Sequence, residues 1–177
     1  MKKRISIYTV CLLTFFNSFS QTEIRAEYQH GFGKNYHLNS FGALYEGFSN
    51  TGKSSWQIGL SYTFDSKIAE NKSSGRNGIA ISLGYRYGFS YGSSGNLITG
   101  IRAGFIFGKD VEQKNHTVFT PSVELGYHYT FNNFGKGMYT TPSIAFGYNI
   151  SMTQGKEKED DYEGTLIIPR VGIGYRF

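Results

Sequence analysis

Apolar and polar residues alternate along most of this chain, with the two-residue period of a β-strand. The clearest unit is Pro-x-[Val/Ile]-x-[apolar]-Gly-Tyr, which occurs at 121–127, 142–148 and 169–175. A fourth copy at 79–85 has Ile in place of Pro. The odd positions of each copy are apolar or aromatic, and the even positions are small or polar. Because successive side chains of a strand point to opposite faces, each copy predicts a strand with one apolar face.

Read with this period, the chain contains eight alternating segments and none with the 3.6-residue period of a helix. The segments span residues 23–31, 40–48, 55–64, 78–89, 97–108, 118–131, 138–150 and 165–177. Each is about as long as the ~9–11 residues with which a tilted strand crosses the hydrocarbon layer of a membrane. The pattern therefore predicts eight membrane-crossing strands.

The connections between these segments alternate in length. Those after the second, fourth and sixth segments (SNTGKS, SYGSSG and NNFGKG) are short turn sequences, whereas those after the third, fifth and seventh are longer or more charged. The connection after the first segment, GKNYHLN, is intermediate. Outer-membrane barrels have short turns on the periplasmic side and longer loops outside. We therefore expect the loops at 65–77 and 151–164 to face the exterior.

Composition decides which face of the strands is inside. The chain has 23 Gly and 30 aromatic residues (14 Tyr, 15 Phe and one Trp), with a mean hydropathy of −0.35. So many aromatic side chains do not fit the lumen of eight strands, which is barely wide enough for ordinary side chains. A closed sheet also leaves no backbone group unpaired in lipid. We predict an all-β fold: a single eight-stranded antiparallel up-and-down transmembrane β-barrel with an apolar, aromatic exterior and a polar lumen of Gly, Arg and Glu.

Charged residues recur on the predicted inner face, with glycines between them. We expect these charges to pair in a network that plugs the lumen, and a narrow conducting pore is the alternative. The network residues are Glu23, Arg25, Glu27, Glu46, Arg86, Arg102, Glu124, His128, Arg170 and Arg176.

The amino-terminal residues predict export. Lys2, Lys3 and Arg4 precede a short apolar run at 5–16, and Ser18 and Ser20 stand where a cleavage site needs small residues. We expect a cleaved signal peptide at 1–20 and one barrel domain at 21–177. The apolar run is shorter than the ~20 residues of a transmembrane helix. Loss of three positive charges lowers the formal net charge from +5 to +2 (5 − 3), which removes the support for nucleic-acid binding.

The one cysteine and the three prolines have structural interpretations. Cys11 lies in the signal peptide, so the mature domain is predicted to have no disulfide and no thiol chemistry. Pro121, Pro142 and Pro169 fall within predicted strands. Because proline cannot donate to the hydrogen-bond ladder, each is expected to mark a bulge or a strand start.

With its strand pattern, loop alternation and terminal VGIGYRF, the chain resembles the family of small OmpA/OmpX-type outer-membrane β-barrels. The resemblance covers residues 21–177 and implies location in the bacterial outer membrane as a monomer, with lipid and lipopolysaccharide as surroundings and an unidentified extracellular partner. It also implies a signal read by the barrel-assembly machinery, carried by Val171, Ile173, Tyr175 and Phe177. The family includes adhesins, lipid A-modifying enzymes and stability proteins, so the fold does not choose among these roles.

Two motifs suggest chemistry. His128 and Thr130 in GYHYTFNN resemble the His and Ser of outer-membrane lipid A deacylases, but Thr130 replaces Ser, Phe131 replaces Asn, and His128 is predicted to face the lumen. The acidic run 156–163 carries hard oxygen ligands for cations without the spacing of a calcium loop, so a solvated loop is the simpler interpretation.

We therefore expect a non-enzymatic outer-membrane barrel with no catalytic residues, cofactor or metal, acting structurally or by adhesion through its extracellular loops. The alternatives are a deacylase-like lipid A-modifying enzyme, a narrow pore, and a soluble lipocalin-like barrel. The last would need its apolar face inside.

Overall fold

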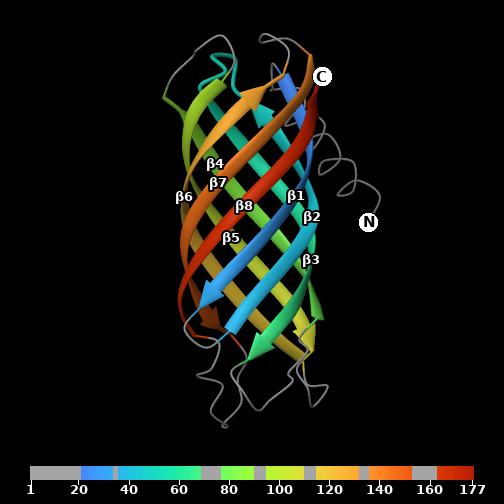
Figure 1. Ribbon diagram of the computed structural model, residues 1–177, viewed down its shortest axis with the longest axis vertical. Coiled ribbons are helices and arrows are strands. Elements are labelled where there is room, and N and C mark those ends of the chain that lie inside the picture. Colours follow the sequence, from blue (N-terminus) through green and yellow to red (C-terminus); the bar gives the residue numbers. More distant parts are fainter. Residues whose placement is uncertain are drawn as a thin grey trace, which may run out of the picture.

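The computed structural model describes residues 21–33, 36–68, 77–89, 95–109, 115–131, 136–152 and 163–177. The predicted signal peptide lies outside these ranges. The described residues form eight strands in one closed antiparallel sheet (Figure 1), in which each strand pairs with the next and β8 pairs with β1. The strands are β1 (Gln21–Gly33), β2 (Tyr36–Phe48), β3 (Ser54–Ile68), β4 (Asn77–Gly88), β5 (Gly95–Lys109), β6 (Asn115–Thr130), β7 (Gly137–Ser151) and β8 (Gly164–Arg176). The predicted eight-stranded antiparallel barrel is confirmed.

Within the described ranges there is no helix long and apolar enough to cross a bilayer.

The barrel has two distinct ends. We call the end that carries Gln21 and Phe177 the terminal end; it is uppermost in Figure 1. The turn between β2 and β3 lies there, where Gly52 adopts a φ of 67° and its amide donates to the carbonyl of Ser49 at 2.8 Å. We call the opposite end, where β1, β3, β5 and β7 finish, the loop end.

Several strands extend further toward the loop end than the alternation predicted. The expected strand 40–48 begins at Tyr36, and the expected strand 55–64 continues to Ile68. Consequently the connection after β1 spans only 34–35, and most of GKNYHLN belongs to strands. Among the residues added to β2, the polar His37 and Asn39 lie on the outer face and the apolar Leu38 on the inner face, so this stretch reverses the alternation by which the other segments were found.

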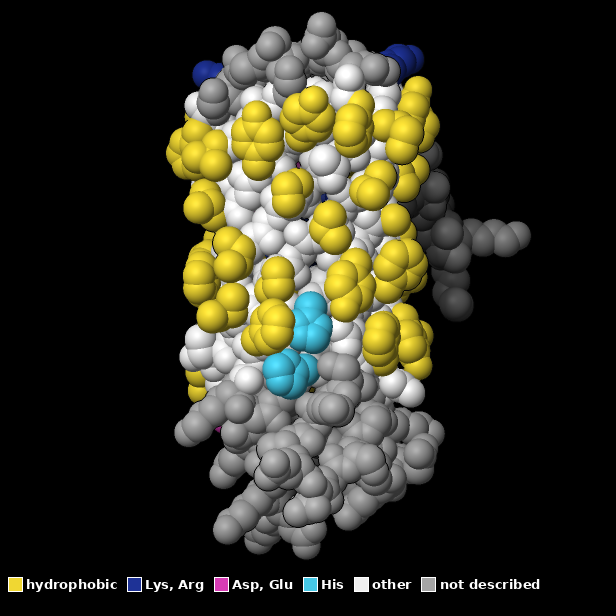
Figure 2. All heavy atoms as spheres, in the orientation of Figure 1, with side chains coloured by type: hydrophobic (Ala, Val, Ile, Leu, Met, Phe, Trp, Pro, Cys, Tyr) yellow, Lys and Arg dark blue, Asp and Glu magenta, His cyan; other side chains and the backbone are white. Residues whose placement is uncertain are grey.

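Large apolar side chains cover the outer wall. Thirty-odd of them lie on the outside with between 37% and 62% of their surface exposed, and the face shown in Figure 2 carries them as an apolar band over the wall between the two ends. At the terminal end, a pair of aromatic residues lies at the end of each of three strands. These edge-to-face pairs are Tyr87–Phe89, Tyr129–Phe131 and Tyr175–Phe177, with ring centroids 5.5, 5.3 and 5.2 Å apart. Such a surface suits a lipid environment with an aromatic girdle at its boundary.

The prolines do not mark bulges or strand starts, so that prediction is wrong. They lie inside β6, β7 and β8, and the strand register is the same on both sides of each. The ladder instead skips two residues wherever a proline lacks the N–H that would face its neighbour. Between β6 and β7, pairing stops at 120–121 and again at 127–128; between β8 and β1 it stops at 168–169. The one register shift among the described pairs falls between His37 and Leu38.

Glycines on the inner wall make room for arginines. Across β4 and β5, Gly84 pairs with Arg102 and Arg86 pairs with Gly100. A Cβ added at Gly100 would lie 2.9 Å from the Cγ of Arg86, closer than non-bonded carbons pack. The glycines are therefore part of the reason that large charged side chains fit in so narrow a lumen.

Gly172→Ala tests this packing. The added Cβ would overlap the side-chain stem of Arg25, and we expect the free energy of unfolding in lipid vesicles to fall by about 1–3 kcal/mol, as for overpacked cores. The measurement is urea unfolding followed by tryptophan fluorescence of Trp56.

Gly104→Ala is the matched control. The nearest atoms to its added Cβ are those of Thr120, at 3.7 and 3.9 Å, which is ordinary van der Waals contact. Stability should stay unchanged or rise slightly, because alanine suits a strand better than glycine does. Equal losses in the two variants would contradict the role given to Gly172.

Candidate functional site: the charge network of the lumen

Ten ionisable side chains gather inside the barrel, and no other feature of the described lumen carries so much charge. They come from six of the eight strands, and each is at most 6% exposed. They are Glu23, Arg25 and Glu27 of β1, Glu46 of β2, Arg86 of β4, Arg102 of β5, Glu124 and His128 of β6, and Arg170 and Arg176 of β8. These are the residues singled out in the sequence, and the structure brings them together in two groups.

The larger group, which we call the central cluster, contains Arg25, Glu27, Glu46, Arg86, Arg102, Glu124 and Arg170. One chain of ion pairs joins β1 to β2 and β4: Arg25 contacts Glu46 at 3.0 Å, and Arg86 contacts the same Glu46 oxygen at 3.2 Å. A second chain joins β1 to β5, since Arg25 contacts Glu27 at 3.3 Å and Glu27 pairs with both terminal nitrogens of Arg102.

Glu124 is the hub of the central cluster. Its carboxylate contacts three guanidinium groups: Arg86, Arg102 at 3.4 Å and Arg170 at 2.8 Å. These arginines lie on three different strands, β4, β5 and β8. The cluster therefore extends across the lumen from wall to wall.

The smaller group, which we call the terminal cluster, lies nearer the terminal end. Arg176 donates to Glu23 at 2.6 Å and to Nε2 of His128 at 2.9 Å. A guanidinium can only donate, so Nε2 is the acceptor and the imidazole is neutral, with its proton on Nδ1. That Nδ1 donates to the hydroxyl of Thr141 at 3.1 Å.

The charges nearly balance. The central cluster holds four arginines and three glutamates, for a formal charge of +1 (4 − 3), and the terminal cluster adds one of each sign. An unpaired buried charge is very costly, whereas a paired and hydrogen-bonded one can be accommodated. The distribution of partners, with most carboxylates shared between arginines, is thus what allows these side chains to be buried.

Neutral polar residues complete the network, and they were not among the predicted site residues. Gln57 accepts from Arg102 at 3.2 Å, Gln29 accepts from Arg170 at 3.1 Å, and Ser122 accepts from Arg170 at 3.2 Å. Tyr139, which is fully buried, packs its ring 4.6 Å from that of His128. The two-residue alternation from Met138 onward places Tyr139 on the inner face, and that signal was available in the sequence.

Side chains in the lumen also bridge the two gaps in the β6–β7 ladder. At the first gap, Thr120 donates to Asn149 at 2.6 Å. At the second, His128 donates to Thr141. Each pair stands opposite in register at the place where backbone pairing stops. His128 therefore has two structural contacts: Arg176 within the terminal cluster, and Thr141 across the gap between β6 and β7.

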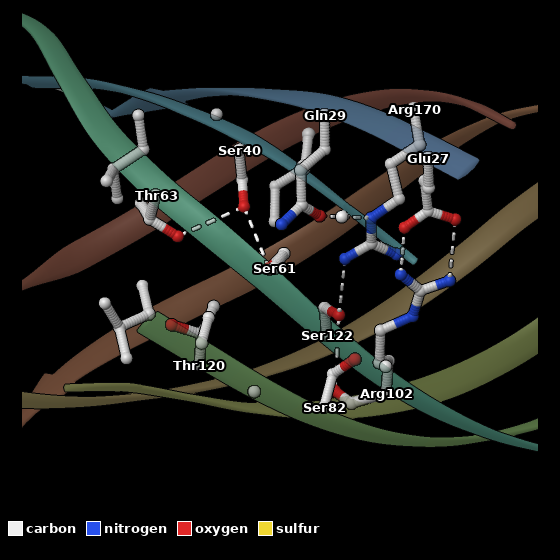
Figure 3. A pocket seen from close by; sticks show the side chains of 18 of the residues that line it. Glu27, Gln29, Ser40, Ser61, Thr63, Ser82, Arg102, Thr120, Ser122 and Arg170 are labelled. Carbon is white, nitrogen blue, oxygen red and sulfur yellow. Dashed lines mark hydrogen bonds and ion pairs between the residues drawn. The ribbon is translucent and has the colours of Figure 1, made fainter. Parts of the chain in front are cut away.

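The clusters lie between two separate cavities. One, of about 70 Å³, opens on the loop-end side; Figure 3 shows Arg102, Glu27 and Arg170 at one side of it and the hydroxyls of Ser40 and Thr63 at the other. The second, of about 260 Å³, lies on the terminal-end side. Its polar lining includes Glu46, Arg86, Asn96, His128 and Arg176. The two cavities have no lining residue in common.

The other candidate residues lie elsewhere. Val171, Ile173, Tyr175 and Phe177 face outward and are 45–55% exposed, and the amide of Phe177 donates to the carbonyl of Thr22 at 3.0 Å. Thr130 is buried in the lumen with His128. The acidic run lies outside the described residues except for Glu163, which accepts from the amide of Ser151 at 3.2 Å. Among the described residues, no group of three or more His, Cys, Asp or Glu is arranged to hold a metal ion.

The closed sheet, the apolar outer wall and the charged lumen together define a membrane-spanning β-barrel. Solved structures with the same fold come from bacterial outer-membrane proteins. The N-terminal β-barrel domain of Pseudomonas aeruginosa OprF matches with a TM-score of 0.56 and 18% identity, over 90% of this chain and 98% of that one.

Two further structures are similar. Neisserial surface protein A matches with a TM-score of 0.53 and 14% identity, over 88% of this chain and 94% of that one. Ail, the attachment invasion locus protein of Yersinia pestis, matches with a TM-score of 0.50 and 14% identity, over 90% and 99%. At these identities the likeness shows the fold, and it confirms the predicted OmpA/OmpX-like barrel at that level.

No protein-family model matches the chain, and no curated protein matches its sequence.

Glu124→Gln tests the hub. The substitution leaves three buried arginines without the carboxylate that they share, and we expect the free energy of unfolding to fall by about 3 kcal/mol or more, as when one partner of a buried ion pair is removed. Unfolding by urea in lipid vesicles measures the loss.

Glu163→Gln serves as the control, because Glu163 is exposed and its loss should change stability by less than about 0.5 kcal/mol. A Glu124→Gln protein as stable as this control would mean that the central cluster does not depend on its hub.

Proposed function

We propose that this protein is a non-enzymatic, non-conducting outer-membrane barrel whose plugged lumen makes it a rigid support for its extracellular loops. The observation that carries the proposal is the central cluster, which links β1, β2, β4, β5, β6 and β8 through ion pairs across the lumen. A solute moving through the barrel would have to break several buried ion pairs. Interactions with the exterior would then depend on the loops.

The two cavities support a closed lumen. They lie on opposite sides of the central cluster and share no lining residue. Eight strands already leave little room inside, and Arg25, Glu46 and Glu124 fill the middle of it with less than 4% of their surface exposed.

The position of His128 supports a structural role over a catalytic one. A deacylase acting on lipid A needs its nucleophile and base on the lipid side of the wall. His128 lies inside the wall, where it donates to Thr141 and accepts from Arg176. Both ring nitrogens are thus engaged, and the base function would require one of them.

Conductance measurements test the plug. The folded protein in planar lipid bilayers is expected to give no single-channel steps. The double variant Glu27→Ala/Arg102→Ala removes both partners of one ion pair and should introduce brief openings, because it widens the constriction without leaving an unpaired charge. Stable channels in the unmodified protein would overturn the proposal of a closed lumen.

Loop replacement tests where the protein acts. Intact cells displaying the barrel would be screened against immobilised proteins and polysaccharides, with residues 69–76 and then 153–162 exchanged for Gly-Ser linkers of equal length. We expect binding to fall at least tenfold in one or both variants. The matched control exchanges 90–94, at the terminal end, and should leave binding unchanged. Equal binding by all variants would contradict a loop-based function.

A further inference from the structure

Two histidines that play no part in the lumen network lie on the outer wall at the loop end. His30 is near the end of β1 and His37 near the start of β2. In Figure 2, histidine side chains appear where β1 and β2 reach the lower border of the apolar band. Both side chains are partly exposed at the boundary of the predicted membrane layer.

The strand register brings the two imidazoles together. His30 pairs with Asn39 and Phe32 pairs with His37, so the histidines are diagonal neighbours on one face of an antiparallel pair, within reach of one another. Their ring centroids are 5.7 Å apart, with an angle of 35° between the ring planes. One cation can contact a nitrogen of each ring at such a separation.

Side-chain hydrogen bonds determine which ring nitrogen of His30 carries the proton. The side-chain oxygen of Asn39 accepts from the hydroxyl of Tyr28 at 2.7 Å and lies 2.5 Å from Nδ1 of His30. A carbonyl oxygen can only accept, so Nδ1 carries the proton and Nε2 keeps its lone pair. A histidine that ligates a metal is usually oriented in this way, by donating its other N–H to an oxygen.

The Asn39 side chain that orients His30 is buried. Asn39 is only 6% exposed although it lies on the outer face of β2. Phe32 packs against both imidazoles, with its ring centroid 4.2 Å from that of His30 and 5.5 Å from that of His37. These contacts restrict the rotamers of both rings before any ligand arrives, which lowers the entropy cost of binding.

We propose that His30 and His37 bind one divalent transition-metal cation of the zinc class on the outer wall of the barrel. Imidazole nitrogens suit Zn²⁺, Cu²⁺ and Ni²⁺, whereas Ca²⁺ and Mg²⁺ prefer oxygen. Water or a ligand from another molecule fills the remaining positions, since the described residues offer no third His, Cys, Asp or Glu to the site.

Titration of the folded, full-length protein in detergent with Zn²⁺ alone, followed by isothermal calorimetry, tests the site. One Zn²⁺ should bind per barrel. His30→Gln and His37→Gln should each weaken binding at least tenfold, and Asn39→Leu should weaken it about 10- to 100-fold, as loss of an orienting partner does. The Asn39 variant keeps both histidines, so it separates an oriented site from two independent imidazoles.

His116→Gln is the matched control, since His116 is a buried histidine of β6, remote from β1 and β2 in the order of the strands. The affinity of the His116→Gln protein for Zn²⁺ should equal that of the unmodified protein. Heat-modifiable migration on gels verifies that each variant is folded. Absence of stoichiometric binding, or unchanged binding in the folded double variant His30→Gln/His37→Gln, overturns the proposal.

Discussion

Pairing of charges in a narrow, enclosed lumen is the constraint on which the rest of this structure depends. Once arginine and glutamate side chains are buried inside, each needs partners, because a buried charge without a partner is strongly destabilising. The partners come from several strands, with Glu124 alone joining β4, β5 and β8 to β6. Glycines such as Gly84 and Gly100 then provide the room that the arginines occupy. With the lumen filled in this way, most of the aromatic residues lie on the lipid face, and Tyr139 is an exception inside.

Much of this arrangement could be predicted because a closed sheet has a simple side-chain period. Alternation alone assigned Arg25 and Glu27 to the lumen and Ile24 and Tyr28 to the outside, and the structure has all four on those faces. Strand number followed from the same pattern. The two-residue period does not reveal which charged side chains form ion pairs, because this pairing depends on the stagger between strands. The sharing of Glu124 among three arginines therefore emerges only in the folded barrel.

The features that escaped prediction depend on how one strand pairs with its neighbour, and the alternation within a single strand does not show this. The stretch from Tyr36 to Asn39 was assigned to a loop, although it forms the first part of β2. Its polar His37 and Asn39 lie on the outer face and its apolar Leu38 on the inner face, which is the reverse of the pattern in the other strands. The proximity of His30 and His37 could not be seen until that stretch was paired with β1. The prolines were misjudged because the barrel keeps its register and omits ladder bonds instead.

The two gaps in the hydrogen-bond ladder between β6 and β7, the β6–β7 seam, make strand pairing uneven around the barrel. Elsewhere, apart from one gap between β8 and β1, the described parts of adjacent strands are joined by backbone hydrogen bonds, whose strength hardly depends on which residues are present. At this seam, side-chain pairs from Thr120 to Asn149 and from His128 to Thr141 bridge the missing bonds. The cohesion of this seam thus depends in part on side chains, and single substitutions there can loosen it without altering the path of the backbone.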